Sequence, residues 1–170
     1  KSINEKSKCV VQMTLTTYDE ALCRKLEPNV CTTKERVNAL KIFHENGIPT
    51  VVWLSPILPF INDTRENIEG ILNYCIEANV YGIICFGMGV TLREGNREYF
   101  YKALDKEFPG MKEKYHYKYG NAYEIPSDRN QELMRLFRGK CREHGIVHSV
   151  DECFAYLHEY SGKYQQLGFF

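Results

Sequence analysis

Three apolar stretches of the sequence are each followed by residues that could hold a polar small molecule. Threonine and serine hydroxyls, an asparagine amide and an aspartate carboxylate form hydrogen bonds with such a ligand, and glycine lets it approach the backbone. The candidate binding residues are Thr14, Thr16, Ser55, Asn62, Asp63 and Gly87. Each of them taken alone can equally be a loop or helix-cap residue. The prediction therefore depends on the elements that bring the three groups together.

The three apolar stretches are predicted to be strands of one parallel sheet. They cover residues 9–17, 50–55 and 81–87 and are apolar nearly throughout, which is typical of parallel strands buried on both faces. Helical segments separate them, so that residues 9–87 are expected to form a β-α-β-α-β unit. In such a unit the carboxyl ends of the strands meet at one edge, where ligands bind.

Helix-capping patterns support the two longer connecting helices. Thr32 and Glu35 form a capping box, and the helix that follows is expected to end at Gly47. Asp63 and Glu66 form a second cap signature, ahead of a core-facing stripe of apolar residues at helical spacing.

The second half of the chain is expected to be helical. Helices are predicted from Asn96 to Pro109, from a Ser127 cap to Gly145, and over residues 150–161, with a tail from 162. The segment 88–95 separates the two halves, so residues 1–90 and 91–170 are predicted to be an α/β part and a helical extension packed on it.

Several function classes find no support in the sequence. The 170 residues carry 22 basic and 22 acidic side chains, a balance that disfavours a strongly basic nucleic-acid binder. No apolar run approaches the length of about 18 residues that a membrane span needs, so no membrane partner is expected. The third glycine of a dinucleotide fingerprint would fall at Leu92, and neither a Walker A nor a G-x-S-x-G sequence occurs.

Seven cysteines are present without any C-x2-C spacing, and we predict no metal site. Cysteine and histidine do gather near the carboxyl end, but their spacing matches no zinc finger. These residues are Cys141, His144, His148, Cys153 and His158. Several cysteines lie in apolar contexts, which favours reduced core thiols in a cytoplasmic protein.

A stretch of alternating lysine and tyrosine is a candidate nucleic-acid contact. Lysines can neutralise phosphates, and aromatic rings can stack on bases. The residues proposed for this role are Lys112, Lys114, Tyr117 and Lys118. The alternative is a solvated amphipathic surface.

Three motifs carry a resemblance to a known family. The first is V-x-(apolar)-(S/T)-(apolar)-T-T followed by D-E-x-x-x-(R/K)-x-L-E-P, over Val11–Pro28. The second is E-R-x-x-A-(apolar) ahead of G-I-P, over Glu35–Pro49, and the third is P-(apolar)-(apolar)-P-x-(apolar)-N-D, over Pro56–Asp63. Together they resemble the radical S-adenosylmethionine superfamily, specifically its spore photoproduct lyase-like group, also described as DNA repair photolyase-like. The helical half agrees more loosely.

The resemblance implies a partial TIM-like (β/α)6 barrel in which these strands are the fourth, fifth and sixth. S-adenosylmethionine would lie across their carboxyl ends, with Thr14 where the family usually has serine. The family's C-x3-C-x2-C motif, which holds a [4Fe–4S] cluster, is absent here. It would lie upstream of Lys1. We therefore expect the carboxyl-terminal portion of a longer lyase-like enzyme, with no cluster and no catalysis from these residues alone. Damaged DNA is one candidate substrate.

The resemblance also implies partners. The missing amino-terminal half would pair with the first strand, and without it the exposed edge over Cys9–Thr16 is expected to drive dimerisation. Two other readings stay open at this point. One is a complete small α/β protein that binds a phosphorylated or sugar-like ligand at the same strand ends, and the other is a non-catalytic module that binds nucleic acid or another protein.

Overall fold

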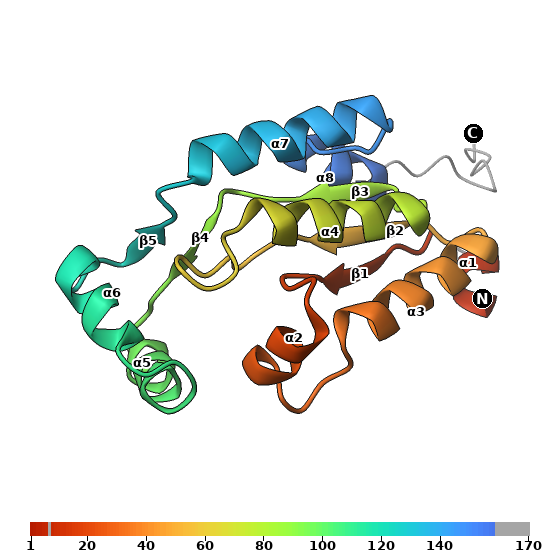
Figure 1. Cartoon of the computed structure of the whole chain (residues 1–170). Coiled ribbons are helices and arrows are strands. Elements are labelled where there is room, and N and C mark those ends of the chain that lie inside the picture. Colours follow the sequence, from red (N-terminus) through yellow and green to blue (C-terminus); the bar gives the residue numbers. More distant parts are fainter. Residues whose placement is uncertain (7, 159–170) are drawn as a thin grey trace, which may run out of the picture.

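The computed structural model describes residues 1–6 and 8–158 as a mixed α/β protein (Figure 1). Its elements follow one another as α1 Ser2–Lys6, β1 Val11–Thr14, α2 Glu20–Leu26, α3 Thr33–Glu45, β2 Thr50–Trp53, α4 Arg65–Glu77, β3 Gly82–Ile84, β4 Gly89–Thr91, α5 Asn96–Glu107, α6 Met111–Tyr119, β5 Glu124–Pro126, α7 Asn130–Glu143 and α8 Val150–His158. The expected tail from residue 162, and the expected end of the last helix, lie outside the described residues.

The three predicted strands form one parallel sheet, as expected. The strand order is β1-β2-β3, with Val11 opposite Thr50 and Val52 opposite Ile83. Helices α2 and α3 connect β1 to β2, and α4 connects β2 to β3, so the β-α-β-α-β order is confirmed. The sheet is open in the described part of the chain, and no closed barrel is formed.

Two of the three expected helix caps differ from the sequence patterns. The capping box before α3 is present, since the Thr32 amide donates to the Glu35 carboxylate at 2.7 Å. These hydrogen bonds from Thr32 hold the pKa of Glu35 below its usual range. The cap of α4, however, is Thr64 and not Asp63, and Arg129 rather than Ser127 occupies the cap position of α7. Both expected caps, Asp63 and Ser127, bind each other instead.

One face of the sheet is covered by α3, α4 and α7, which share the largest hydrophobic core. In Figure 1, α4 crosses in front of the strands and α7 runs above them. The side chains of Leu40, Ile71 and Phe137 are buried there beside Val52 and Ile83. Because α7 comes from the second half of the chain, this core extends across the predicted division at residue 90. That division itself stays a prediction.

The opposite face is covered at β3 by α8. Cys153 packs there with Val51 and Ile84, and the Ile83 amide donates to the carbonyl of Val147 at 2.8 Å. Gly82 permits this approach, because a side chain at that position would meet the Cys153 sulfur at 2.8 Å. At β1 the same face is exposed.

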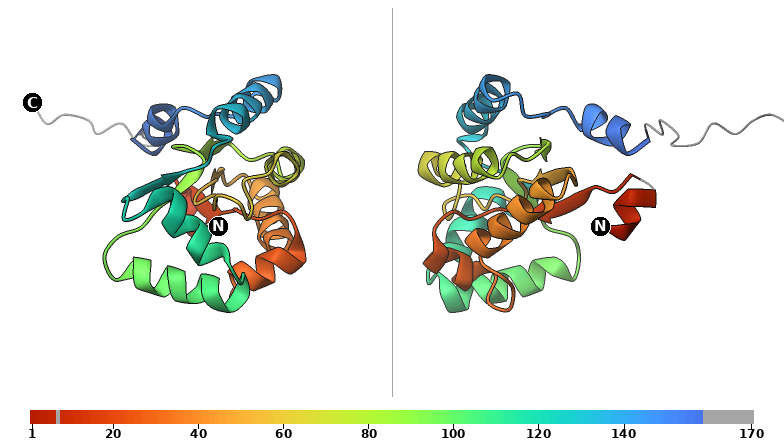
Figure 2. Two further views of the ribbon diagram at one scale, coloured as in Figure 1. Left: turned by 60° about the vertical axis from the view of Figure 1, so that its left-hand side comes forward. Right: turned by 90° about the vertical axis from the view of Figure 1, so that its right-hand side faces the viewer.

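A second, smaller core joins α5 and α6 to a two-stranded antiparallel ladder of β4 and β5 (Figure 2). Tyr115 is fully buried in it, and its hydroxyl donates to the carbonyl of Pro59 at 2.7 Å. The sequence patterns predicted neither α6 nor the ladder. Because β5 lies in the second half of the chain, this half is not wholly helical as expected. Gly89 is required in the ladder, since a Cβ there would lie 2.6 Å from the carbonyl oxygen of Ile125.

None of the helices within the described ranges is long and apolar enough to cross a membrane.

The outer edge of β1 has no strand beside it in the described structure. The amides of Val11 and Leu15 donate to the carbonyls of Pro49 and Trp53 in and beside β2. Hydrogen bonds alternate along a strand, so the amide of Gln12 faces the free edge. Dimerisation through this edge stays a prediction.

We expect Gln12→Pro to weaken association of the chain at high concentration, because proline removes the edge donor and spares the bonds to β2. Multi-angle light scattering over a concentration series measures the mass. Gln12→Ala is the matched control, since it also loses the side-chain contact to Trp53 but keeps the amide. Equal masses for the two variants at every concentration would rule out pairing through β1.

Candidate functional site

A cavity of about 340 Å³ lies at the carboxyl end of β1, between that strand and α5. We call it the α5 cavity. Three predicted binding residues line it, namely Thr14, Thr16 and Asn62. Its apolar wall comes mainly from α5 and from the loop after β2, through Phe100, Leu104 and Leu58. Its volume lies at the lower end of the range of about 300–1,000 Å³ that is usual for small-molecule sites.

Thr16 and Asn62 are held by bonds within the protein. Asn62 is buried, its amide oxygen accepts from the Leu58 amide at 2.6 Å, and its amide nitrogen donates to the Thr16 carbonyl at 3.0 Å. Asn67 donates to the same carbonyl at 2.9 Å. The two asparagines therefore fasten the loop after β2 to the segment after β1, and they shape the cavity.

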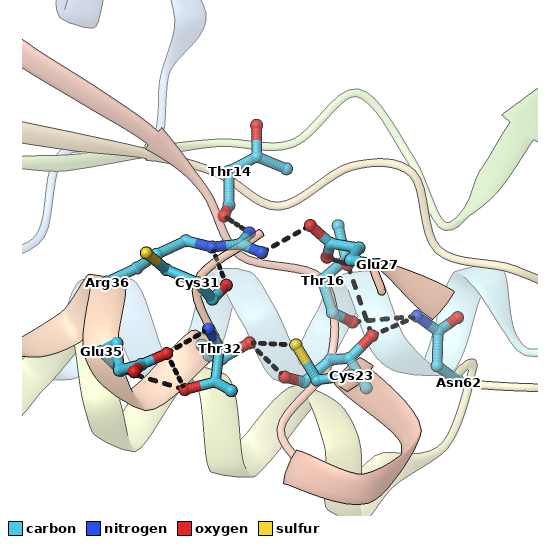
Figure 3. A network of polar contacts seen from close by, with 11 residues as sticks. Thr14, Thr16, Cys23, Glu27, Cys31, Thr32, Glu35, Arg36 and Asn62 are labelled. Carbon is cyan, nitrogen blue, oxygen red and sulfur yellow. Dashed lines mark hydrogen bonds and ion pairs between the residues drawn. The ribbon is translucent and has the colours of Figure 1, made fainter. Parts of the chain in front are cut away.

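Arg36 joins the end of β1 to the end of α2 and to the loop before α3 (Figure 3). Its guanidinium donates to the Thr14 carbonyl at 2.8 Å, to the Cys31 carbonyl at 2.8 Å and to the Glu27 carboxylate at 2.5 Å. The second carboxylate oxygen of Glu27 accepts from the Thr16 hydroxyl at 3.1 Å. Glu27 lines the cavity, so this network fixes a carboxylate, ion-paired with Arg36, in its wall.

Thr14 is the predicted residue best placed to meet a ligand. It is exposed, and its hydroxyl makes no hydrogen bond within the part of the chain that the structure describes. Figure 3 shows this hydroxyl pointing away from the Arg36 network, while the carbonyl of the same residue is held by Arg36. The backbone of Thr14 is thus fixed and its side chain is available.

A second cavity of about 610 Å³ lies between the carboxyl end of β3 and strand β5, and we call it the β5 cavity. Ser55 and Gly87, two further predicted residues, line it. Pro56, Val90 and Asn96 line both cavities. Five of the six predicted residues are therefore divided between two adjoining cavities.

Asp63 lines neither cavity. It is buried, and its carboxylate accepts a hydrogen bond of 2.5 Å from the Ser127 hydroxyl. The Ser127 amide in turn donates to the Met88 carbonyl at 2.8 Å. Asp63 thus connects the loop after β2 to the segment ahead of α7, which is a structural position.

The lysines of the candidate nucleic-acid stretch all have partners on α6 or beside it. Lys112 pairs with Asp105 at 2.7 Å, Lys118 pairs with Asp128, and the Lys114 ammonium lies 3.9 Å from the centre of the Phe60 ring. Tyr117 is 95% exposed. These contacts account for the lysines without a nucleic acid, and a nucleic-acid contact here stays a prediction.

Five of the seven cysteines are buried, and Cys75, Cys85 and Cys141 share the main core. In the described part of the chain, no three side chains of histidine, cysteine, aspartate or glutamate lie close enough together to hold a metal ion. Burial raises the pKa of Cys85 to about 11 and that of Cys141 to about 12, and it raises the pKa of Cys75 as well. Such thiols are protonated at neutral pH.

Glu27 and Arg36 were not among the residues predicted for the site. Both occur within the motifs quoted above, Glu27 in the L-E-P end of the first and Arg36 in the E-R start of the second. The motifs could have indicated them, but nothing in their spacing shows that the eight residues between them bring the two charges together.

No family model matches the chain. The chain is similar to uncharacterized proteins from Mycobacterium bovis and from two strains of Mycobacterium tuberculosis. Each is 25% identical over 116 residues, which make up 68% of this chain and 34% of the relative. The match therefore spans about a third of the length of these curated relatives.

Arg36→Lys is expected to lower the free energy of unfolding by about 1–3 kcal/mol, because lysine cannot bond three acceptors in the fixed geometry of a guanidinium. Urea unfolding followed by circular dichroism measures the change. Arg24→Lys is the matched control, since the exposed pair of Arg24 with Glu20 is expected to contribute less than about 1 kcal/mol. Equal losses in the two variants would show that the Arg36 network has no special weight.

Stability is also expected to fall as the pH rises from about 9 to about 11. The folded state keeps its proton on Cys85 over this range, whereas the unfolded thiol ionises, so unfolding releases a proton and becomes more favourable. Urea unfolding at a series of pH values measures this fall. Cys85→Ala should reduce its slope by about 1 kcal/mol per pH unit near pH 10. Cys31→Ser, at an exposed thiol, should leave the slope as it is.

Proposed function

We propose that this chain is the carboxyl-terminal portion of a radical S-adenosylmethionine enzyme related to spore photoproduct lyase, and that the α5 cavity contributes to binding S-adenosylmethionine. The observation that carries the proposal is the position of the cavity. It lies at the carboxyl end of β1 and is lined by Thr14 and Thr16, which belong to the first motif of the resemblance.

The chemistry of the cavity wall supports such a ligand. S-adenosylmethionine combines an apolar, planar base with a positive sulfonium, an ammonium and a carboxylate. Phe100, Leu104 and Leu58 provide an apolar surface, and Glu27 provides a carboxylate that its ion pair with Arg36 orients. Lys25, whose ammonium lies 4.3 Å from the centre of the Phe108 ring, provides a positive charge at the same cavity. The Thr14 hydroxyl can donate to or accept from the ligand.

The cysteines described here do not fit an iron–sulfur cluster. A cluster needs several thiolates in one place, whereas five of these thiols are buried, and no three cysteine, histidine, aspartate or glutamate side chains among the described residues could hold a metal ion. In the proposed enzyme, the cluster would be held by a part of the protein outside this chain, and cluster and cofactor together would supply a radical. The residues of this chain would bind and orient the cofactor, and the chain alone would be inactive.

The open sheet is compatible with a partial barrel. In this proposal, β1–β3 are three adjacent strands of a (β/α)6 barrel, and the free edge of β1 pairs with the amino-terminal half of the same protein. The short match to longer relatives supports a larger parent protein. The burial of five thiols as core side chains supports a cytoplasmic location.

Ala103→Phe is expected to weaken binding of S-adenosylmethionine about tenfold or more, because the added ring occupies space in the α5 cavity. Saturation-transfer difference NMR on the 170-residue chain suits a weak complex and gives the affinity by titration. Ala155→Phe, at an exposed position on α8, is the matched control.

Thermal unfolding of both variants checks that they are folded. Absence of any saturation transfer to S-adenosylmethionine, or equal affinities in the two folded variants, would contradict the proposed place of the cofactor.

A further inference from the structure

The β5 cavity has a lining that differs in charge from the α5 cavity. Among its lining residues Glu124 is the only ionisable side chain, and it is exposed. The basic residues that flank β5 and α7 in the chain are paired elsewhere. Arg129 makes two hydrogen bonds to Glu132, at 3.1 and 3.0 Å, and Lys118 pairs with Asp128. The cavity therefore offers a carboxylate and no cation, which disfavours a phosphate.

An aromatic ring stands at this cavity. Phe86 is 68% exposed, which is unusual for so large an apolar side chain at the end of a core strand. Its ring centre lies 5.9 Å from that of Trp53, and the Trp53 indole donates to the Gln12 side chain at 2.7 Å. Trp53 thus supports the ring of Phe86, and the Phe86 ring can stack on a planar ligand.

Amide groups and open backbone complete the lining. The Asn130 side chain accepts from the Met88 amide at 2.8 Å, which fixes its orientation in the cavity wall. Asn96 contributes a second amide at the boundary with the α5 cavity. Gly87 has a φ of 152°, and a side chain there would meet Asn130 at 3.4 Å. That distance is an ordinary van der Waals contact, so the positive φ, and not a lack of space, favours glycine here.

We propose that the β5 cavity binds a planar organic molecule that carries no phosphate and is uncharged or positively charged, such as an unphosphorylated nucleoside. Its aromatic face would stack on Phe86, its polar edge would meet the asparagine amides, and Glu124 would repel an anion. The β5 cavity adjoins the α5 cavity, so this molecule could be the substrate on which the proposed S-adenosylmethionine enzyme acts. That assignment as a substrate rests on the proposed function. The binding itself does not rest on it.

Trp53 gives a direct readout, since it is the only tryptophan of the chain and its ring contacts Phe86. Cytidine and cytidine 5′-monophosphate form a matched pair of probes that differ only in the phosphate. Titration of the chain with each probe, with tryptophan emission excited at 295 nm, compares their affinities. We expect cytidine to quench the emission and to bind about three to ten times more tightly than the monophosphate at low ionic strength.

Glutamate variants test whether the charge of Glu124 causes the preference for cytidine, and a variant of Phe86 tests the stacking contact. Glu124→Gln is expected to bring the two affinities together, because it removes the charge that repels the phosphate. Glu98→Gln, at an exposed glutamate of α5 outside both cavities, is expected to keep the preference for cytidine. Phe86→Ser should weaken cytidine binding at least about tenfold, which is measured by saturation-transfer NMR because the variant also alters the emission of Trp53.

Three results would overturn the proposal. The first is that cytidine does not bind at concentrations up to about 10 mM. The second is that the monophosphate or a single-stranded oligonucleotide binds as tightly as cytidine or more tightly. The third is that Glu124→Gln keeps the same preference for cytidine over the monophosphate. The Ala103→Phe variant distinguishes a failure of this proposal from a failure of the proposed function, because Ala103 lines the α5 cavity and not the β5 cavity. It should weaken binding of S-adenosylmethionine and leave binding of cytidine unchanged, so either site can fail without the other.

Discussion

The bonds of one guanidinium hold the end of the first strand in the position on which the candidate site depends. Arg36 binds the carbonyl of Thr14, which faces the free edge of the sheet, and the carbonyl of Cys31 in the loop before α3. It also binds Glu27, whose other oxygen accepts from Thr16. A strand edge, a loop and a helix end are thereby fixed at once. Since the pair is largely removed from solvent, each partner would be costly to bury without the other.

The parallel sheet and its helices could be predicted because their signals are local and agree with one another. Continuous apolar runs indicated the strands, and the pattern of Thr32 and Glu35 located the start of α3 correctly. The strand-end rule also placed Thr14, Thr16 and Asn62 at one cavity. The capping box joins two residues that lie three positions apart, so a short stretch of sequence contains both partners. For the residues at the strand ends, the general rule for parallel sheets says which distant segments come together.

The parts that were not predicted depend on contacts between distant residues. The ladder of β4 and β5 joins three-residue segments about 35 positions apart, and neither segment has a strand signal of its own. Helix α6 is stabilised by Tyr115 and Tyr119, whose hydroxyls reach the carbonyls of Pro59 and Pro126. Asp63 matched a helix-cap pattern, but its neighbour Thr64 has the cap and Asp63 binds Ser127, which the pattern cannot show.

The packing of α7 and α8 has a consequence for the order in which the chain can become stable during synthesis. Both helices are made after the sheet, yet α7 completes the main core against α4, and the segment before α8 lies along β3. The sheet and its first helices leave the ribosome before α7 and α8 have been synthesised. Until then Ile71 and Ile83 lack the side chains of Leu133 and Phe137 as neighbours in their common core. The nascent protein therefore passes through an interval in which chaperones have an apolar surface to bind, and that interval closes only with the last described helices.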